Sequence, residues 1–179
     1  MKQLDEIAQG IAETGFEGFQ AHLLDGVTGS GKTEVYFDLV ARCVAASKQC
    51  LILLPEIALT GQIVKRLKKV LGDKIAVYHS RLNNMERVEI WKAVQAGTTS
   101  VVGPRSALFL PFTQLELVVI DEEHDPSFKQ HDPAPRYNAR DSAIMLAIQQ
   151  NAKVVMGSAT PALETLYNAD HELYGLVEL

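Results

Sequence analysis

The decisive stretch of this chain is Gly26-Val27-Thr28-Gly29-Ser30-Gly31-Lys32-Thr33. It fits the pattern G-x-x-x-x-G-K-[ST] at every fixed position. Glycines let the backbone bend into a concave nest of N–H groups, and this nest binds phosphates together with the N-terminus of the following helix. In such a loop, Lys32 neutralises the outer phosphates and the hydroxyl of Thr33 ligates Mg²⁺. The motif therefore predicts a bound nucleoside triphosphate between a strand and a helix.

The composition fits one globular domain. The chain has 179 residues, 47% of them hydrophobic, and a net charge of −5. This acidic balance excludes a domain that holds nucleic acid by bulk positive charge, but it is compatible with a local DNA-contacting face. The start, MKQLDEIAQG, lacks the apolar run of a signal peptide, and no apolar stretch reaches the roughly 20 residues of a membrane-spanning helix. We expect a cytoplasmic protein with no membrane partner.

The two cysteines, Cys43 and Cys50, do not form a C-x-x-C pair. No histidines stand at zinc-binding distances from them in the sequence. We expect both to be small buried residues in a reducing compartment, with no zinc bound by this chain.

Apolar, strand-like runs alternate with amphipathic helical patterns along the chain. Several of the runs are apolar almost throughout, which is typical of parallel strands covered on both faces. This alternation predicts an α/β fold, a three-layer sandwich around a mainly parallel central sheet. We expect residues 1–19 to form a helix and a connector, and residues 20–179 to form the single domain. The predicted strands are 21–25, 50–55, 74–78, 99–103, 117–121 and 153–157.

Two asparagines mark the beginnings of predicted helices. Asn83 followed by Glu86 fits a capping box, and Asn138 followed by Asp141 fits a second cap for a helix that runs to about Gln150. The segment 122–140 between them is irregular and rich in Pro, Asp and Lys. A loop of this length in a compact domain is usually functional.

The run Leu117-Val118-Val119-Ile120-Asp121-Glu122-Glu123-His124 is an apolar strand that ends in an acidic cluster. The carboxyl ends of parallel strands form the ligand-binding edge of a sheet. Asp121 is placed to hold Mg²⁺ opposite Thr33, and Glu122 is placed to orient and polarise the water that attacks the γ-phosphate. A solvated acidic turn is the ordinary alternative, and the upstream phosphate loop argues against it.

Other motifs follow the predicted strands. Segment 157–161, GSATP, carries small and hydroxylated residues that could hydrogen-bond to the acidic cluster, or it is an ordinary loop in which Thr160 caps a helix beginning at Pro161. Arg105 and Ser106 could contact a phosphodiester backbone, or Arg105 is an ordinary surface or salt-bridge residue. The aromatic and basic residues of segment 128–140 suit stacking on unpaired bases, and they equally suit a loop whose rings pin it to the core.

Six segments together resemble the first motor lobe of the primosomal replication-restart helicases, the PriA family. They are GVTGSGKTEVY, PEIALT, GPRSALFLP, DEEHD, RYNARD and GSATPALE, in this order, and the resemblance covers about residues 23–167. It implies a RecA-like P-loop NTPase lobe of helicase superfamily two, with ATP and Mg²⁺ as cofactors. It also implies unwinding from three-prime to five-prime, with single-stranded and forked DNA and other primosome and replication-restart proteins as partners.

The resemblance also implies a role for individual residues. The nucleotide loop is Gly26, Val27, Thr28, Gly29, Ser30, Gly31, Lys32 and Thr33, and the catalytic residues are Lys32, Asp121 and Glu122, with Thr33 and Asp121 on Mg²⁺. The residues that couple hydrolysis to DNA are His124, Gly157, Ser158, Ala159 and Thr160. The expected DNA contacts are Thr60, Arg105, Ser106, Phe128, Lys129, Tyr137 and Arg140.

Some features of the family are altered or missing in this chain. Gly61 stands where the family usually has Pro, and Pro104 stands where it usually has Thr, which removes a hydroxyl and a backbone donor from a DNA-facing turn. The N-terminal DNA-binding region, the paired zinc-binding cysteine clusters and the second motor lobe are not in the sequence. Because the second lobe supplies an arginine to the ATP site, we expect this lobe alone to bind ATP weakly and to turn it over slowly.

Two other classes of function compete with a helicase lobe. A small kinase or GTPase-like switch would need an acceptor pocket or an N-K-x-D-type segment, and the sequence contains no recognisable example of either. A nucleotide-gated module that binds DNA or protein without catalysis stays open as the alternative.

Overall fold

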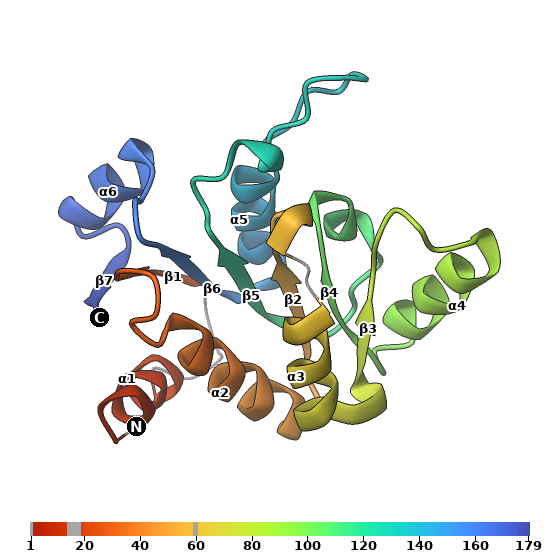
Figure 1. The fold of residues 1–179 in the computed structure, drawn as a ribbon, viewed down its shortest axis with the longest axis horizontal. Helices are drawn as coiled ribbons and strands as arrows, with labels where there is room; N and C mark the ends of the chain where they lie inside the picture. The colour runs from red at the N-terminus through yellow and green to blue at the C-terminus, as the bar shows by residue number, and fades with distance from the viewer. Residues whose placement is uncertain (1, 14–18, 59–60) are drawn as a thin grey trace.

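The computed structural model describes residues 2–13, 19–58 and 61–179. Its centre is a seven-stranded sheet in the order β3-β4-β2-β5-β6-β1-β7, and neighbouring strands run parallel (Figure 1). The strands are β1 Gln20–Asp25, β2 Gln49–Leu53, β3 Ile75–Val77, β4 Ser100–Gly103, β5 Leu115–Asp121, β6 Lys153–Ser158 and β7 Gly175–Glu178. The predicted α/β class and all six predicted strands are confirmed. β7 was not predicted.

Among the residues that the structure describes, three helices pack on each face of the sheet. The sheet and the helices on its two faces make three layers (Figure 1). On one face pack α1 Lys2–Glu13, α2 Lys32–Ala45 and α3 Gly61–Leu71. On the other face pack α4 Asn84–Gln95, α5 Ala139–Gln150 and α6 Leu163–Asp170. The short 3-10 turns are η1 Glu56–Ala58, η2 Gly72–Lys74, η3 Arg105–Phe109 and η4 Pro126–Phe128. Within the described ranges, no helix combines the length and the apolar character that crossing a bilayer requires.

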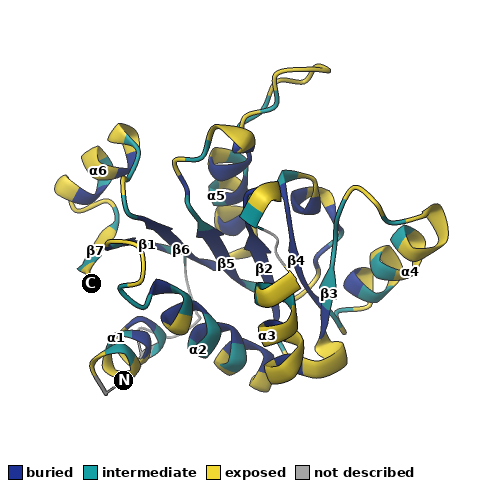
Figure 2. Ribbon diagram, viewed as in Figure 1, coloured by how far each residue is buried: buried dark blue, intermediate teal, exposed yellow. Residues whose placement is uncertain are grey.

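The core is split into two apolar clusters by the sheet itself. Leu23 and Leu24 are neighbours on β1, yet they belong to different clusters because successive side chains of a strand point to opposite faces. Figure 2 shows the central strands buried along their length, while the outer faces of the helices are exposed. Cys43 and Cys50 are free and buried in the α1–α3 cluster, as predicted.

The helix starts follow the predicted caps in part. Asn83 Oδ1 accepts from Glu86 N at 3.0 Å and Glu86 Oε2 accepts from Asn83 N at 2.8 Å, so the capping box of α4 is confirmed. Asn138 caps α5 through the N–H of Arg140, and the helix ends at Gln150 as predicted. The alternative in which Thr160 caps a helix beginning at Pro161 is wrong, because α6 begins at Leu163 with Ala162 as its N-cap.

The long segment between β5 and α5 leaves the body of the molecule as an arm. It makes the short turn η4, and a bridge between Lys129 and Asn138 closes its base. Beyond this bridge the chain projects away from the sheet, and residues 131–136 at its end are exposed (Figures 1 and 2). The arm and the phosphate loop both follow carboxyl ends of strands, so they lie at the same edge of the sheet.

A truncation in the sheet tests this core. Leu51 on β2 is 0% exposed, so Leu51→Ala should lower the free energy of unfolding by about 2–5 kcal/mol through lost burial and a residual cavity. The matched control is Leu163→Ala on α6, where the side chain is 80% exposed and the change should stay within about 0.5 kcal/mol. Urea denaturation measures both. Equal effects of the two substitutions would contradict the assigned core.

Candidate nucleotide-binding site

The phosphate loop connects β1 to α2 and folds tightly on itself. Gly29 and Gly31 have φ values of 86° and 105°, a left-handed conformation that glycine adopts at little cost. Gly26 N donates to the carbonyl oxygen of Ser158 at 3.1 Å, which ties the start of the loop to the end of β6. A Cβ atom on Gly26 would lie 2.6 Å from Ser30 Oγ, so a larger residue would push the loop open.

The polar groups of the loop fit a phosphate ligand. Lys32 is only 7% exposed, and its Nζ donates to the carbonyl oxygens of Gly26 at 2.5 Å and Val27 at 3.2 Å. The buried hydroxyl of Ser30 has no hydrogen-bond partner in the described part of the chain. Phosphate oxygens would satisfy both polar groups. One is the Lys32 ammonium group, which donates to main-chain carbonyl oxygens, and the other is the Ser30 hydroxyl, which has no partner among the described residues.

The loop and the acidic end of β5 meet in one pocket of about 280 Å³. The structure therefore brings Lys32 and Thr33 together with Asp121 and Glu122, although the two pairs are far apart in the sequence. The residues that line the pocket are Thr28, Gly29, Gly31, Lys32, Thr33, Glu34, Arg66, Asp121 and Glu122. Arg66 was not predicted, and it forms an ion pair with Glu34 (2.5 Å) at the rim.

Asp121 is held in a partly desolvated position. Burial and the neighbouring charge of Glu122 raise the pKa of Asp121, while Tyr36 and Lys32 act in the opposite direction. A carboxylate and a threonine hydroxyl fit Mg²⁺, which typically binds one or two carboxylates and completes its shell with phosphate and water oxygens. Among the described residues, no group of three or more His, Cys, Asp or Glu side chains lies close enough to form a metal site by itself.

Glu122 has a strained backbone. Its φ of 50° is left-handed, a conformation that costs a non-glycine residue about 1–3 kcal/mol and is common at functional positions. The turn is held by Asp125 N, which donates to the Glu122 carbonyl oxygen at 2.8 Å. As a result, the Glu122 carboxylate lines the pocket beside Asp121, where it could orient a water molecule.

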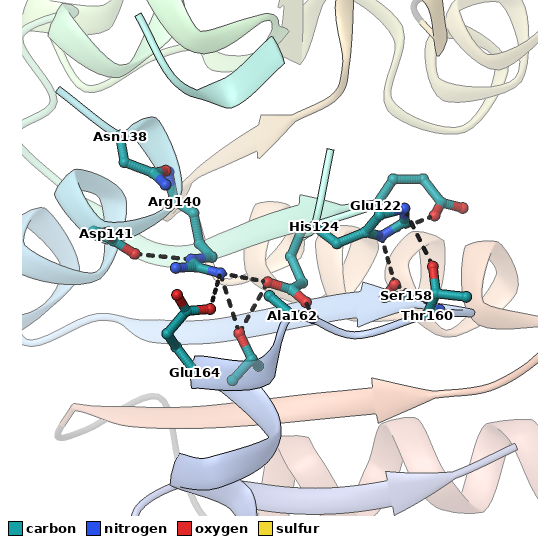
Figure 3. Close-up of polar contacts among 11 residues, drawn as sticks. Glu122, His124, Asn138, Arg140, Asp141, Ser158, Thr160, Ala162 and Glu164 are labelled. Atoms are coloured by element: carbon teal, nitrogen blue, oxygen red, sulfur yellow. Dashed lines mark hydrogen bonds and ion pairs between the residues drawn. The ribbon is translucent and has the colours of Figure 1, made fainter. Parts of the chain in front are cut away.

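The predicted coupling residues lie next to this turn (Figure 3). His124 Nδ1 is 2.7 Å from Ser158 Oγ and 3.7 Å from Glu122 Oε2, and His124 Nε2 is 3.3 Å from Thr160 Oγ1. The carbonyl oxygen of Gly157 accepts from Glu123 N at 3.2 Å, and Ala159 follows Ser158 in the same segment. The loops after β5 and β6 therefore form one hydrogen-bonded unit.

A buried ion pair that the sequence did not predict lies next to this unit (Figure 3). Glu123 Oε2 accepts from Arg140 Nη1 at 3.1 Å and from Thr165 Oγ1 at 2.9 Å, while Glu123 Oε1 accepts from Ala162 N at 2.6 Å. Arg140 also donates to Asp141 at 2.8 Å. The sequence did carry one signal, since a third consecutive acidic residue after a buried strand needs a cation if it turns inward.

Two of the predicted DNA contacts do not fit the structure. Phe128 is 1% exposed and belongs to the apolar core, which agrees with the alternative of a loop pinned by its rings. Arg140 is buried because its guanidinium group is paired with Glu123 and Asp141. Neither side chain is accessible to a DNA strand in this arrangement.

The other predicted contacts are placed differently. Arg105, Ser106 and Tyr137 line a common pocket of about 230 Å³, and Arg105 Nη1 donates to the carbonyl oxygen of Ser127 at 2.7 Å. Lys129 is exposed at the base of the arm. Thr60 lies outside the described residues.

Comparison with known proteins agrees with this geometry. The DEAD/DEAH box helicase model matches residues 6–169. The chain is 48% identical to the replication restart protein PriA of Haemophilus influenzae over 88% of its length, and 43% identical to that of Chlamydia trachomatis over 98%. It spans only 22% and 23% of these two relatives, respectively.

Solved structures show the same fold. RecG bound to a three-way DNA junction matches 98% of this chain with a TM-score of 0.70 and 21% identity, and the match covers 23% of the RecG chain. The helicase MrfA bound to DNA matches 98% of this chain with a TM-score of 0.67 and 17% identity, over 26% of MrfA.

The buried ion pair gives a prediction for stability. Arg140→Ala leaves the Glu123 carboxylate buried without its cation, so the free energy of unfolding should fall by about 3–5 kcal/mol. Arg42→Ala, which removes the solvent-exposed pair with Asp38, should change it by at most about 0.5 kcal/mol. Guanidinium denaturation compares the two. A loss for Arg140→Ala as small as that for Arg42→Ala would show that the pair is not formed.

The raised pKa of Asp121 gives a prediction for pH dependence. Ionisation costs more in the folded protein than in the unfolded chain, so the protein loses stability as the pH rises through the raised pKa. Asp121→Asn should therefore melt at a higher temperature than the wild type at pH 7, with a difference that shrinks towards pH 4. Differential scanning calorimetry at both pH values measures this, with Asp73→Asn at an exposed position as control. A difference independent of pH would contradict the assigned environment.

Proposed function

Because the chain belongs to the DEAD/DEAH box helicase family, we propose that it is the ATP-binding first motor lobe of a replication-restart DNA helicase. One observation carries this proposal: Lys32 and Thr33 share a pocket with Asp121 and with the strained, left-handed Glu122. A nucleotide-gated module without catalysis would have no need to hold a second carboxylate under strain beside the first.

Each residue of the pocket has a task in the proposed hydrolysis. The loop amides and Lys32 bind the phosphates, and Thr33 and Asp121 would hold Mg²⁺. When bound, Mg²⁺ neutralises charge on the phosphate oxygens. Glu122 orients the attacking water and accepts its proton.

The unit formed by His124, Ser158 and Thr160 connects this chemistry to the rest of the lobe. These three side chains join the residue after the acidic cluster to the loop after β6. A shift of Glu122 on hydrolysis would therefore move two loops at the carboxyl edge of the sheet. We propose that this is how ATP turnover is passed on to bound DNA.

We propose single-stranded and forked DNA as the polymer on which the motor acts, together with other primosome and replication-restart proteins as partners. The relatives are replication restart proteins, and RecG, which has the same fold, is described bound to a three-way DNA junction. Arg105, Ser106 and Tyr137 in their common pocket and Lys129 on the arm are the accessible candidates for DNA contact. Pro104 lines the same pocket without a side-chain hydroxyl or a backbone N–H to offer. We propose the cytoplasm as the place of this function, because the relatives are bacterial replication restart proteins.

We propose that the remaining parts of the helicase lie outside these residues. The chain spans about a fifth of the length of these relatives. Within it, the proposed motor lobe comprises residues 20–179, and α1 packs on α2 of this lobe. A second lobe would complete the ATP site with an arginine, so this chain alone should hydrolyse ATP slowly. Any zinc would also be bound by the part of the protein outside this chain.

The proposal is tested by Glu122→Gln in the full-length protein that carries this chain. Loss of the general base should lower DNA-stimulated ATP turnover by at least about 100-fold and abolish unwinding, while nucleotide affinity changes little. ATPase rates, strand separation of a forked duplex and equilibrium binding of an ADP analogue measure these. Glu89→Gln, at an exposed position on α4 outside this pocket, is the matched control and should keep the wild-type activity. Unchanged unwinding in Glu122→Gln would favour the non-catalytic binding module.

A further inference from the structure

Tyr36 occupies a place in the site for which the proposed hydrolysis gives no reason. It lies on α2 one turn after Lys32, so both side chains point to the same side of the helix. Tyr36 is 3% exposed, and its hydroxyl group has no hydrogen-bond partner of normal geometry in the described part of the chain. A buried hydroxyl without a partner is rare in native proteins and needs an explanation.

The hydroxyl group lies against the backbone of the carboxyl edge. A Cβ atom on Gly157 would lie 1.5 Å from Tyr36 Oη and 3.3 Å from Lys32 Cδ, so only glycine leaves room for the tyrosine. Gly157 is the register partner of Asp121 across β5 and β6. The phenol group is therefore beside the carboxylate that would hold Mg²⁺.

The electrostatics agree with this placement. Burial, followed by the charges of Asp121 and Glu122, raises the pKa of Tyr36 well above its ordinary value. The group is a neutral phenol at physiological pH, and a neutral phenol can donate one hydrogen bond. The acceptor in reach is the carboxylate group of Asp121.

We propose that Tyr36 is a positioning residue for the metal site. Its hydroxyl donates a hydrogen bond to the Asp121 carboxylate and fixes the orientation in which Asp121 meets Mg²⁺. This inference rests on the proposed function for the presence of a Mg²⁺–nucleotide complex, and it goes beyond that function by adding a residue that touches neither metal nor nucleotide. Groups that orient metal ligands in this way typically change metal affinity by about 10–100-fold.

The competing explanation is that Tyr36 only fills space between α2 and the sheet. Tyr36→Phe separates the two, because phenylalanine keeps the ring and removes only the hydroxyl. If the ring alone matters, the binding of Mg²⁺ and nucleotide does not change. If the hydroxyl positions Asp121, the protein still folds and binds nucleotide, but Mg²⁺ strengthens that binding less.

The experiment measures the dissociation constant of a fluorescent ADP analogue for the full-length protein in excess EDTA and in saturating Mg²⁺. The ratio of the two constants is the coupling between metal and nucleotide. In Tyr36→Phe this ratio should fall at least about tenfold, while the constant in EDTA stays within about twofold of the wild type. Tyr167→Phe, at an exposed tyrosine on α6, is the control and should keep the wild-type ratio.

The results discriminate between the positioning role of Tyr36 and the proposed function. A ratio in Tyr36→Phe equal to that of the wild type would overturn the positioning role while leaving the nucleotide site intact. A wild-type protein that binds no nucleotide in either condition would instead overturn the proposed function, and the inference with it.

Discussion

The parallel pairing of β5, β6 and β1 is the constraint on which the site depends. The register aligns Gly157 of β6 with Leu24 of β1 on one side and with Asp121 of β5 on the other. Since all three strands end at the same level, the phosphate loop, the acidic turn and the loop after β6 begin within two strand spacings of one another. A sheet with one of these strands reversed would send one of these loops to the opposite edge, even with the same local sequences.

Two glycines at the carboxyl ends of these strands allow side chains of α2 and of the phosphate loop to lie close to the sheet. Gly157 lies under the hydroxyl of Tyr36, and Gly26 lies against Ser30 and the last residue, Leu179. At Gly157 the space left by the missing side chain is filled by groups from α2, so Lys32 and Tyr36 lie against the end of β6. The cost is a set of partly desolvated polar groups, among them the Asp121 carboxylate with its raised pKa. Such a set is unfavourable for folding alone and useful for binding a charged ligand.

The sequence predicts this site well because its information is local there. A loop motif, an apolar strand and an acidic end each lie within a few residues, and the parallel α/β pattern places them together. The sequence predicts less about contacts between residues that lie far apart along the chain. The inward turn of Glu123 depends on Arg140, on Thr165 and on the N–H of Ala162, and Phe128 is buried because α5 and the sheet enclose it. β7 was missed because it has four residues, is mostly exposed and is defined by its pairing with β1.

The left-handed conformation of Glu122 has a structural consequence beyond the role in hydrolysis that we propose for this residue. Consecutive residues of an extended strand would alternate between the two faces, but the turn at Glu122 gives three successive carboxylates two different environments. Asp121 and Glu122 line the pocket, while Glu123 enters the interior and binds the first turns of α5 and α6. The exposed arm ends where α5 begins, at the bridge residue Asn138, two positions from Arg140. The buried ion pair between Arg140 and Glu123 therefore lies between the solvent-exposed arm and Glu122, the carboxylate that we propose for hydrolysis.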